Sequence, residues 1–382
     1  MRKLIFLLAC SFIFIFPLWT QQVIENPKQP SNPAAGRTVK LRELMRIHDD
    51  GEKIVFKNPY QLQIGDDGSI HFANLGEFFK YDAQGRLVYR VVKRGQGPGE
   101  AVMGTQALLT KDGLLIQAIS PPKMMRFDPK GIYLGEDRTT MTNMFKFIAL
   151  VDGKIYAFLE ESPPFGNLKN PDYFDVPKSF CVFSPDLKNI QKPFQFPCRW
   201  YLGPGYGWQM ARFDFAFRDL ESIFVVHGVD YRIDYFNAKK NAIEKTITRK
   251  YERVKRPPEK RDLRPNVRQA PAEEFYYDIS KVLIAGDNLW VITSTRNKRQ
   301  SRLIDVFDVQ GKYIDNFYLD FPSGITPVDF FLGRVVLKNG FLYTIDEDAE
   351  GFFSIAKYEI LDSGKREVKK YAFPGAKGGR RW

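Results

Sequence analysis

The side chains best suited to metal chemistry in this sequence are few and widely separated. Only three histidines occur, His48, His71 and His227. If the chain forms a ring of repeats, His71 and His227 fall on opposite sides of it and both can face a central channel. Zinc, however, takes three protein ligands even in an open catalytic site. His71 and His227 are therefore weak metal candidates, and Ca²⁺ bound by carboxylates is an alternative without a spacing signature. No other cofactor is predicted.

The sequence contains no pattern typical of nucleophilic catalysis. It has no Gly-x-Ser-x-Gly segment, and no cysteine with an identifiable histidine partner. Paired acids occur at 66–67 and 346–348, where turns are expected and carboxylates are usually solvated. A glycosidase needs two acids that converge across a cleft, which spacing in sequence does not show. A non-catalytic role is therefore favoured, and enzymatic activity stays undecided.

Residues suited to binding gather in two segments. Trp200, Tyr206 and Trp208 belong to one aromatic, glycine-rich run, and Arg253 and Arg256 belong to a segment, 249–268, with nine basic and three acidic residues. Aromatic faces stack on ligands and cations bind acidic groups. Together they predict a surface for an acidic glycan or a protein. A plainer interpretation is favoured for each segment, namely aromatic residues that cap the core and a basic loop that is merely solvated.

Gln96 and Glu100 lie in a third unusual segment, Arg94-Gly95-Gln96-Gly97-Pro98-Gly99-Glu100. It lacks the Lys-Ser/Thr of a phosphate-binding loop, and a strand is expected after it instead of a helix. We expect glycine and proline to shape a tight crossing, with Glu100 accepting hydrogen bonds from the amides of the loop. Gln96 and Glu100 remain candidate ligand-binding residues because this crossing and the two segments above are expected on one face.

These segments lie between copies of a repeated unit. Each copy is a strand, a turn with Gly or Asp, a second strand, and a corner of the form aromatic-Asp-x-x-Gly. The corners begin at Tyr81, Phe127 and Phe307, with weaker copies at Phe183, Phe236 and Tyr358. Strands repeating at about 50 residues are typical of a β-propeller. We predict an all-β fold, a six-bladed β-propeller of four-stranded antiparallel blades over residues 38–373, with its last strand at 368–373. Residues 38–47 are either a strand or one helical turn, and a strand that closes the ring or edges a blade is favoured.

The crossing at 94–100 resembles the Gly-x-Gly-Pro-Gly-x motif of NHL-type repeats. With the Phe-Asp-x-x-Gly corners, the chain is similar to the exported six-bladed β-propeller proteins of Gram-negative bacteria, in which this motif also leads from the first blade into the second. The resemblance implies the fold and an exported location. It implies no settled activity, so it transfers no catalytic residue to this sequence.

The N-terminus has the order of an export signal. Arg2 and Lys3 precede an apolar run, 4–19, and a polar stretch follows. We predict a signal peptide at 1–22, either cleaved or kept as an anchor. Lipidation of Cys10 is a third option, disfavoured because only six apolar residues precede this cysteine. Residues 23–37 are predicted to be a tether and 374–382 a tail.

Charge and cysteine usage complete the expectations. The net charge is +12, which favours polyanionic partners, but export and the lack of a recognition motif argue against nucleic acid. Cys181 and Cys198 are either a disulfide or two buried thiols, and buried thiols are favoured.

The sequence therefore predicts a monomeric, non-catalytic binding or scaffold module in the periplasm or at the cell surface. Membrane contact is expected only through the signal, an anchor or lipidation. The alternative is a metal-dependent enzyme similar to a lactonase or glycan lyase, with its site in the central channel.

Overall fold

The computed structural model describes residues 21–49, 54–161, 163, 170–204, 206–258, 270–321, 326–327 and 334–361. Every regular element within these ranges is a β-strand, so the predicted all-β class is confirmed. In this part of the chain, no helix is long and apolar enough to cross a membrane.

Antiparallel sheets of four strands repeat along the chain. The first sheet contains β3 (Pro59–Ile64), β4 (Ile70–Asn74), β5 (Glu77–Tyr81) and β6 (Leu87–Val91). The second contains β7 (Met103–Thr110), β8 (Gly113–Ser120), β9 (Pro122–Phe127) and β10 (Tyr133–Arg138). The third contains β11 (Phe145–Val151), β12 (Lys154–Glu160), β14 (Lys178–Phe183) and β15 (Gln191–Phe196). Each pairs its strands in chain order, as successive hairpins do.

The remaining main sheets use strands from both ends of the chain. The fourth contains β18 (Asp214–Asp219), β19 (Ser222–Val226), β20 (Arg232–Asn237) and β21 (Ala242–Arg249), with β1 (Gln22–Asn26) added in parallel to β21. A nine-stranded sheet contains β22 (Ile279–Ala285), β23 (Asn288–Arg296), β24 (Arg302–Asp308), β25 (Tyr313–Asp320), β2 (Arg37–His48), β29 (Phe353–Leu361), β28 (Phe341–Glu347), β26 (Thr326–Pro327) and β27 (Val335–Lys338).

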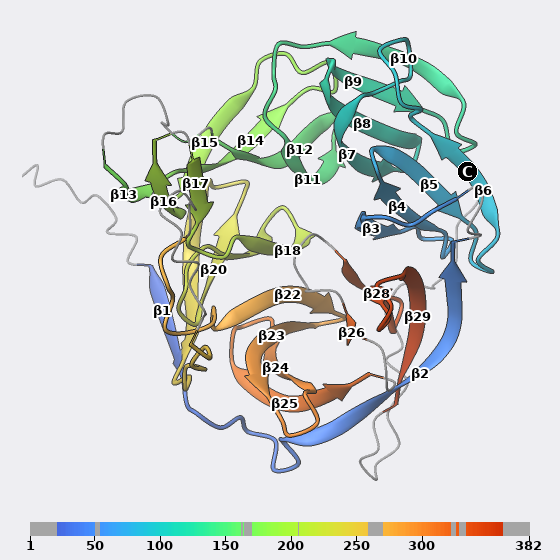
Figure 1. Ribbon diagram of the computed structural model, residues 1–382. Coiled ribbons are helices and arrows are strands. Elements are labelled where there is room, and N and C mark those ends of the chain that lie inside the picture. Colours follow the sequence, from blue (N-terminus) through green and yellow to red (C-terminus); the bar gives the residue numbers. More distant parts are fainter. Residues whose placement is uncertain are drawn as a thin grey trace, which may run out of the picture.

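The main sheets are arranged as a ring around a central opening, with β3, β7, β11, β18 and β22 nearest that opening (Figure 1). Residues of β3, β7, β11, β18, β22 and β27 all line one central cavity of about 1120 Å³. Radial stacking buries both faces of each sheet and leaves only short edges. The chain therefore has a propeller-type fold.

The aromatic-Asp-x-x-Gly corners connect the third and fourth strands of a sheet. In the first corner, Asp82 Oδ1 accepts hydrogen bonds from the amides of Gln84 and Arg86 at 3.0 and 2.9 Å. In the second, Gly131 has a φ of +82°, and a Cβ there would lie 2.7 Å from the ring of Tyr89. The aspartate thus satisfies the turn amides, and the glycine allows its backbone geometry and the close approach.

The sixth corner was placed wrongly. Tyr358 lies within β29, and the equivalent turn begins at Asp348, whose Oδ1 accepts from the amides of Glu350 and Phe352. This turn joins β28 to β29, one connection earlier than expected. The predicted last strand, 368–373, lies outside the described residues, and the edge of β29 is already paired with β2.

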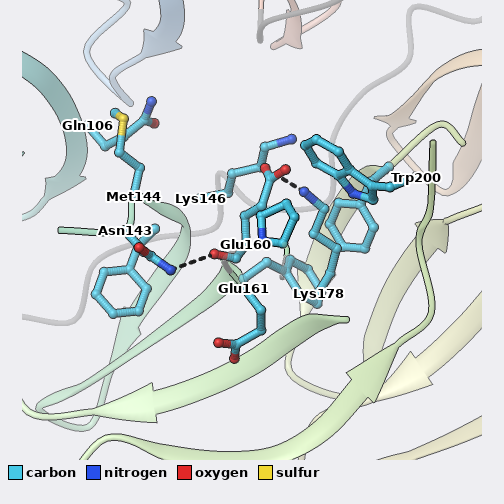
Figure 2. Close-up of a pocket in the computed structure, with 12 residues that line it drawn as sticks. Gln106, Asn143, Met144, Lys146, Glu160, Glu161, Lys178 and Trp200 are labelled. Atoms are coloured by element: carbon cyan, nitrogen blue, oxygen red, sulfur yellow. Dashed lines mark hydrogen bonds and ion pairs between the residues drawn. The ribbon is translucent and has the colours of Figure 1, made fainter. Parts of the chain in front are cut away.

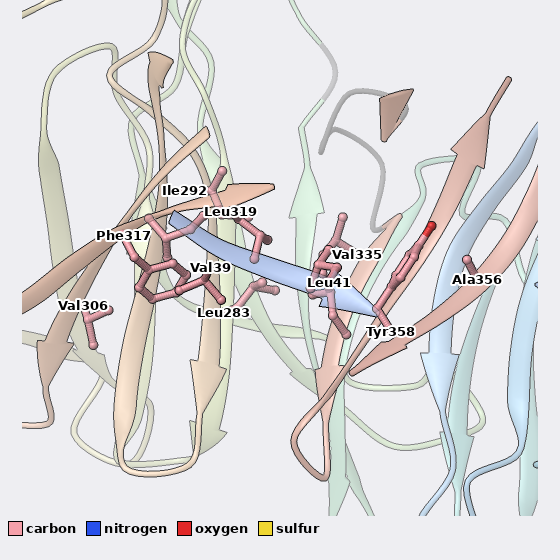
Figure 3. Close-up of a cluster of buried hydrophobic side chains, with 12 residues drawn as sticks. Val39, Leu41, Leu283, Ile292, Val306, Phe317, Leu319, Val335, Ala356 and Tyr358 are labelled. Carbon is pink, nitrogen blue, oxygen red and sulfur yellow. The ribbon is translucent and has the colours of Figure 1, made fainter. Parts of the chain in front are cut away.

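Strand β2 joins the beginning of the folded chain to its end. It runs parallel to β25 over 37–40 and antiparallel to β29 over 40–48. Its Val39 lies beside Phe317 and Leu319 (Figure 3). Val39 is 2% exposed, and complete burial of such a side chain stabilises a fold by about 1.5–3 kcal/mol. The closing strand therefore comes from the N-terminal side.

Part of the predicted tether, 23–37, is also a strand. Residues 22–26 form β1, paired with β21. The buried Asn26 donates to the carbonyls of Thr248 and Gly311 and accepts from the amide of Tyr313. Asparagine and proline content suggested a flexible segment, but this asparagine instead satisfies buried backbone groups of two sheets.

Candidate functional site

The crossing at 94–100, between β6 and β7, is a loop held in place by hydrogen bonds. Glu100 Oε2 accepts a hydrogen bond from the amide of Gly97 at 3.0 Å, as predicted. The buried Lys123 donates to the carbonyl of Gly97 at 2.7 Å and pairs with Glu136 at 2.9 Å. Gln96 is exposed. Glu100 therefore stabilises the loop, and its carboxylate is already engaged.

Arg253 and Arg256, the two arginines predicted to bind a ligand, pair with acidic residues of the same connection between β21 and β22. Arg253 Nε lies 3.2 Å from Asp278 Oδ1, and its guanidinium lies over the ring of Phe275 at 4.7 Å. Arg256 pairs with Glu273 at 3.0 Å. This part of the basic segment is thus neutralised locally, because the acids at 273–278 fold back onto it. The rest, 259–268, lies outside the described residues.

The aromatic run forms part of a separate three-stranded sheet. It contains β13 (Asp172–Asp175), β16 (Arg199–Gly203) and β17 (Tyr206–Gln209). Trp208 pairs with Tyr201 and lies 5.0 Å from Tyr206, ring centroid to centroid. Because neighbouring strand residues point to opposite faces, Trp200 faces away from this group. The predicted aromatic cluster is therefore divided between the two faces of the small sheet.

The two candidate metal ligands lie in different surroundings. His71 lines the central cavity, whereas His227 does not. His227 instead contacts Asp234 at 2.7 Å and the carbonyl of Pro197 at 3.1 Å. Among the described residues, no group of three or more His, Cys, Asp or Glu side chains is arranged to hold a metal ion.

His71 is held by a hydrogen-bond chain that is unsuited to nucleophilic catalysis. Ser69 Oγ donates to Asp67 at 2.5 Å, and His71 Nε2 lies 2.9 Å from the same Oγ. Since the carboxylate only accepts, the serine proton is committed to it and His71 Nε2 is the donor. Burial lowers the pKa of His71 to about 4, which leaves it neutral and weakly basic. Ser69 is itself buried.

The two cysteines are buried free thiols, as favoured from the sequence. Burial raises the pKa of Cys181 to about 12 and that of Cys198 to about 11. Both therefore pack as small apolar groups, and neither provides a thiolate at neutral pH.

The central cavity is basic. Its described walls carry six cationic and three acidic side chains. The cations are Lys80, Lys111, Lys146, Arg212, Lys281 and Lys338, and the acids are Asp66, Asp67 and Asp214. Two cations pair with acids, Lys338 with Asp66 at 2.7 Å and Lys281 with Asp214 at 3.3 Å. An excess of positive charge within low-dielectric walls favours an anionic occupant.

A side pocket of about 430 Å³ adjoins this cavity, and Gln106, Lys146 and Phe213 line both. It lies among the start of β11, the end of β12 and the start of β14 (Figure 2). Its apolar wall consists of Met144, Phe145, Phe158, Trp200 and Phe213. Its polar groups include Asn143, Glu160, Glu161 and Lys178. The cavity and the pocket are neighbours, and together they form the candidate site.

Two lysines dominate the electrostatics of the pocket. Lys178, 1% exposed, pairs with Glu160 at 2.5 Å (Figure 2). The ammonium groups of Lys146 and Lys178 lie 5.6 and 5.8 Å from the ring centroid of Phe213. Lys146 has no ion-pair partner among the described residues. Its side chain lines the cavity and is exposed to water there. The surrounding protein nevertheless removes part of the hydration of the ammonium group. This desolvation, and next the charge of Lys178, lowers the pKa of Lys146.

Sequence reasoning missed Lys146 and Lys178. Neither belongs to a motif, and each lies at the start of a strand that is otherwise mainly apolar, Phe145–Val151 or Lys178–Phe183. A lysine within such a run was the available signal, since burying an ammonium without a partner is costly.

Comparison with known proteins shows the fold alone. No family model and no curated protein matches this sequence. A protein of Bacteroides fragilis described as exported has a TM-score of 0.51 at 11% identity, over 89% of this chain and 100% of that one. A member of the DUF4221 family from Bacteroides vulgatus has a TM-score of 0.52 at 9% identity, over 85% and 99%. A gluconolactonase of Xanthomonas campestris has a TM-score of 0.40 at 12% identity, over 87% and 97%.

Proposed function

We propose that this protein is a non-catalytic, exported binding protein that holds a small ligand in its central cavity and side pocket. The observation that carries the proposal is a pair of adjoining spaces, of about 1120 and 430 Å³, that share lining residues. Its described walls offer charged and hydrogen-bonding groups around an apolar surface, the composition of a ligand site. The Ser69–His71 contact and the buried thiols supply no activated nucleophile.

The proposal includes six blades. The six cavity-lining strands β3, β7, β11, β18, β22 and β27 each begin a sheet or a part of one. Strand β2 then completes the last blade, made of β27, β28, β29 and β2. This arrangement agrees with the resemblance to NHL-like exported propellers, and the order of the N-terminal segment supports export to the periplasm or cell surface.

The loop-side residues Gln96, Glu100, Tyr206, Trp208, Arg253 and Arg256 have a smaller part in this proposal. Several are engaged by neighbouring groups, so a protein or acidic glycan on that face is secondary to the cavity. A metal-dependent lactonase or lyase has no supporting observation here, because the cavity walls present mainly cations and no metal-ligand cluster among the described residues.

Binding and turnover assays on the purified protein test this function. We expect saturable one-to-one binding of a small organic ligand by equilibrium dialysis, and no turnover of lactones or polyuronates. Gln106→Trp, which fills the junction of the two spaces, should abolish binding, whereas Gln84→Trp on an exposed turn should not. Turnover that Gln106→Trp removes would show an enzyme, and binding unaffected by Gln106→Trp would place the ligand elsewhere.

A further inference from the structure

We propose that the side pocket binds a small organic monocarboxylate, with the carboxylate at Lys146 and an aromatic or aliphatic body against the pocket wall. This inference rests on the proposed function and names the ligand class of the same site. It follows from Lys146, which has no ion pair among the described residues, and from the character of the wall.

The acids around the pocket are already paired. Glu160 pairs with Lys178 at 2.5 Å, and Glu161 accepts from Lys192 at 2.6 Å. The hydroxyl of Ser179 also donates to Glu161 at 2.6 Å. These contacts hold both carboxylates, and neither forms an ion pair with Lys146, on which Asp214 and Glu160 act only at longer range. An external anion would supply the missing partner.

Lys146 is placed to receive that anion. It lies at the junction of the pocket and the central cavity, where a ligand can reach it from solvent. Its ammonium group is close to the ring of Phe213, which Lys178 also contacts. Two cations beside one ring repel each other, and a bound carboxylate would convert this repulsion into two favourable interactions.

The wall selects the body of the ligand. Met144, Phe158, Trp200 and Phe213 present apolar surface to the pocket. The indole Nε1 of Trp200 is buried without an acceptor among the described residues, which adds an unused donor to this wall. Among the described residues that line the pocket, Lys146 is the one cation without an ion pair, so the pocket matches a single negative charge. An amphipathic monoanion therefore fits better than a phosphate or a polyanion.

Calorimetry with matched probes tests the assignment. The probes are phenylacetate, its neutral isostere phenylacetamide, galacturonate as a hydrophilic acid, and inorganic phosphate. We expect phenylacetate to bind at least about 10-fold more tightly than each of the others. Lys146→Gln should weaken phenylacetate binding by about 10-fold or more, the loss of one charge-assisted contact. Lys130→Gln, which removes the same charge from an exposed turn, should leave the affinity unchanged.

A second readout reports on Lys146 itself. Binding of a carboxylate raises the pKa of this lysine, so at about pH 9, just below the usual lysine pKa, complex formation should take up protons. Buffers of different ionisation enthalpy reveal this uptake, and Lys146→Gln should remove it. Circular dichroism confirms that the variant is folded.

The outcomes separate this inference from the proposed function. Equal binding of phenylacetamide, or wild-type affinity in Lys146→Gln, overturns the assignment while leaving a binding cavity in place. Tighter binding of galacturonate or phosphate replaces the ligand class. If no probe binds wild-type protein at millimolar concentration, the assigned class is wrong, and the dialysis experiment above decides the proposed function separately.

Discussion

Replacement of Arg249 should destabilise the protein strongly, because its charge is buried against a single carboxylate. The side chains of Arg249 and Asp305 are 5% and 0% exposed, and Arg249 Nε donates to Asp305 Oδ2 at 2.8 Å. Tyr231 and Tyr313 donate to the same carboxylate at 2.7 Å each. Arg249→Met keeps the apolar stem of the side chain but leaves Asp305 without its cation.

Loss of one partner from a buried ion pair costs about 3–5 kcal/mol. From the typical unfolding entropy per residue, this corresponds to a fall in Tm of about 4–6 °C for a chain of this length. Differential scanning calorimetry at neutral pH measures the fall. The matched control is Arg86→Met, since Arg86 also pairs with an aspartate, Asp82, but is 77% exposed. Its loss should cost less than about 1 kcal/mol.

The pH dependence tests the cause. Burial raises the pKa of Asp305, and Arg249 opposes that rise, so Arg249→Met should raise the pKa further. A carboxyl group whose folded pKa exceeds its unfolded pKa loses stability as pH rises through the interval between them. The deficit of Arg249→Met should therefore be large at neutral pH and shrink in acid, where Asp305 is protonated. Adding Asp305→Asn to Arg249→Met should recover part of the lost stability. A deficit below 1 kcal/mol, or one independent of pH, would refute this reasoning.

Three further predictions concern other parts of the molecule. Lys146→Met should raise the Tm of the ligand-free protein by about 1 °C, because it removes a cation that burial and Lys178 disfavour, and it should abolish carboxylate binding. Calorimetry measures both effects, and a fall in Tm would contradict the prediction. Cys181 and Cys198 should resist thiol reagents in the native state and react fully in denaturant, because both thiols are buried and have raised pKa values. Mass spectrometry after labelling in denaturant distinguishes two free thiols, which are labelled, from a disulfide, which is not. Asn26→Ala should lower the free energy of unfolding in urea by about 2–4 kcal/mol, since buried backbone groups of two sheets lose their partner. Asn241→Ala, at an exposed position, should lower it much less.

Local features of the fold were predictable from the sequence. The Asp82 and Asp128 corners contain the hydrogen-bonding side chain, the amides it binds and the required glycine within five residues. Such a turn forms wherever these residues occur together. The prediction at Tyr358 failed because the equivalent turn, at Asp348, has no aromatic residue before it. The chemistry of the turn depends on the aspartate and the glycine, so the aromatic position misled the assignment.

Closure of the ring was predictable only in part, because a strand at 38–47 was expected but its partners were not. Strand β2 pairs with β25 and β29, more than 270 residues away in sequence, and no local signal distinguishes this partner from the segment at 368–373. Both segments mix apolar and charged residues, and this composition specifies no partner for either of them. The same limit explains why Asn26 was assigned to a tether, since its partners at 311 and 313 come from a distant sheet.

The candidate site lies at the centre of the ring, and this position affects how its residues must be interpreted. Departures from the repeat at 94–100, 200–208 and 249–268 were expected to hold the ligand, but their described residues mostly bind one another. Lys146 is different, because it occupies a regular position on β11, the first strand of the third sheet. Its neighbour Lys178 belongs to the same sheet, and Phe213 immediately precedes the fourth. A lysine in an apolar strand looks unfavourable when the strand is considered alone. In a propeller the same position opens into a central cavity, where the ammonium group keeps contact with water and a ligand can reach it. In this fold, a cation on an inner strand without an acidic partner is therefore a stronger indication of a binding site than a basic loop whose charges are already neutralised.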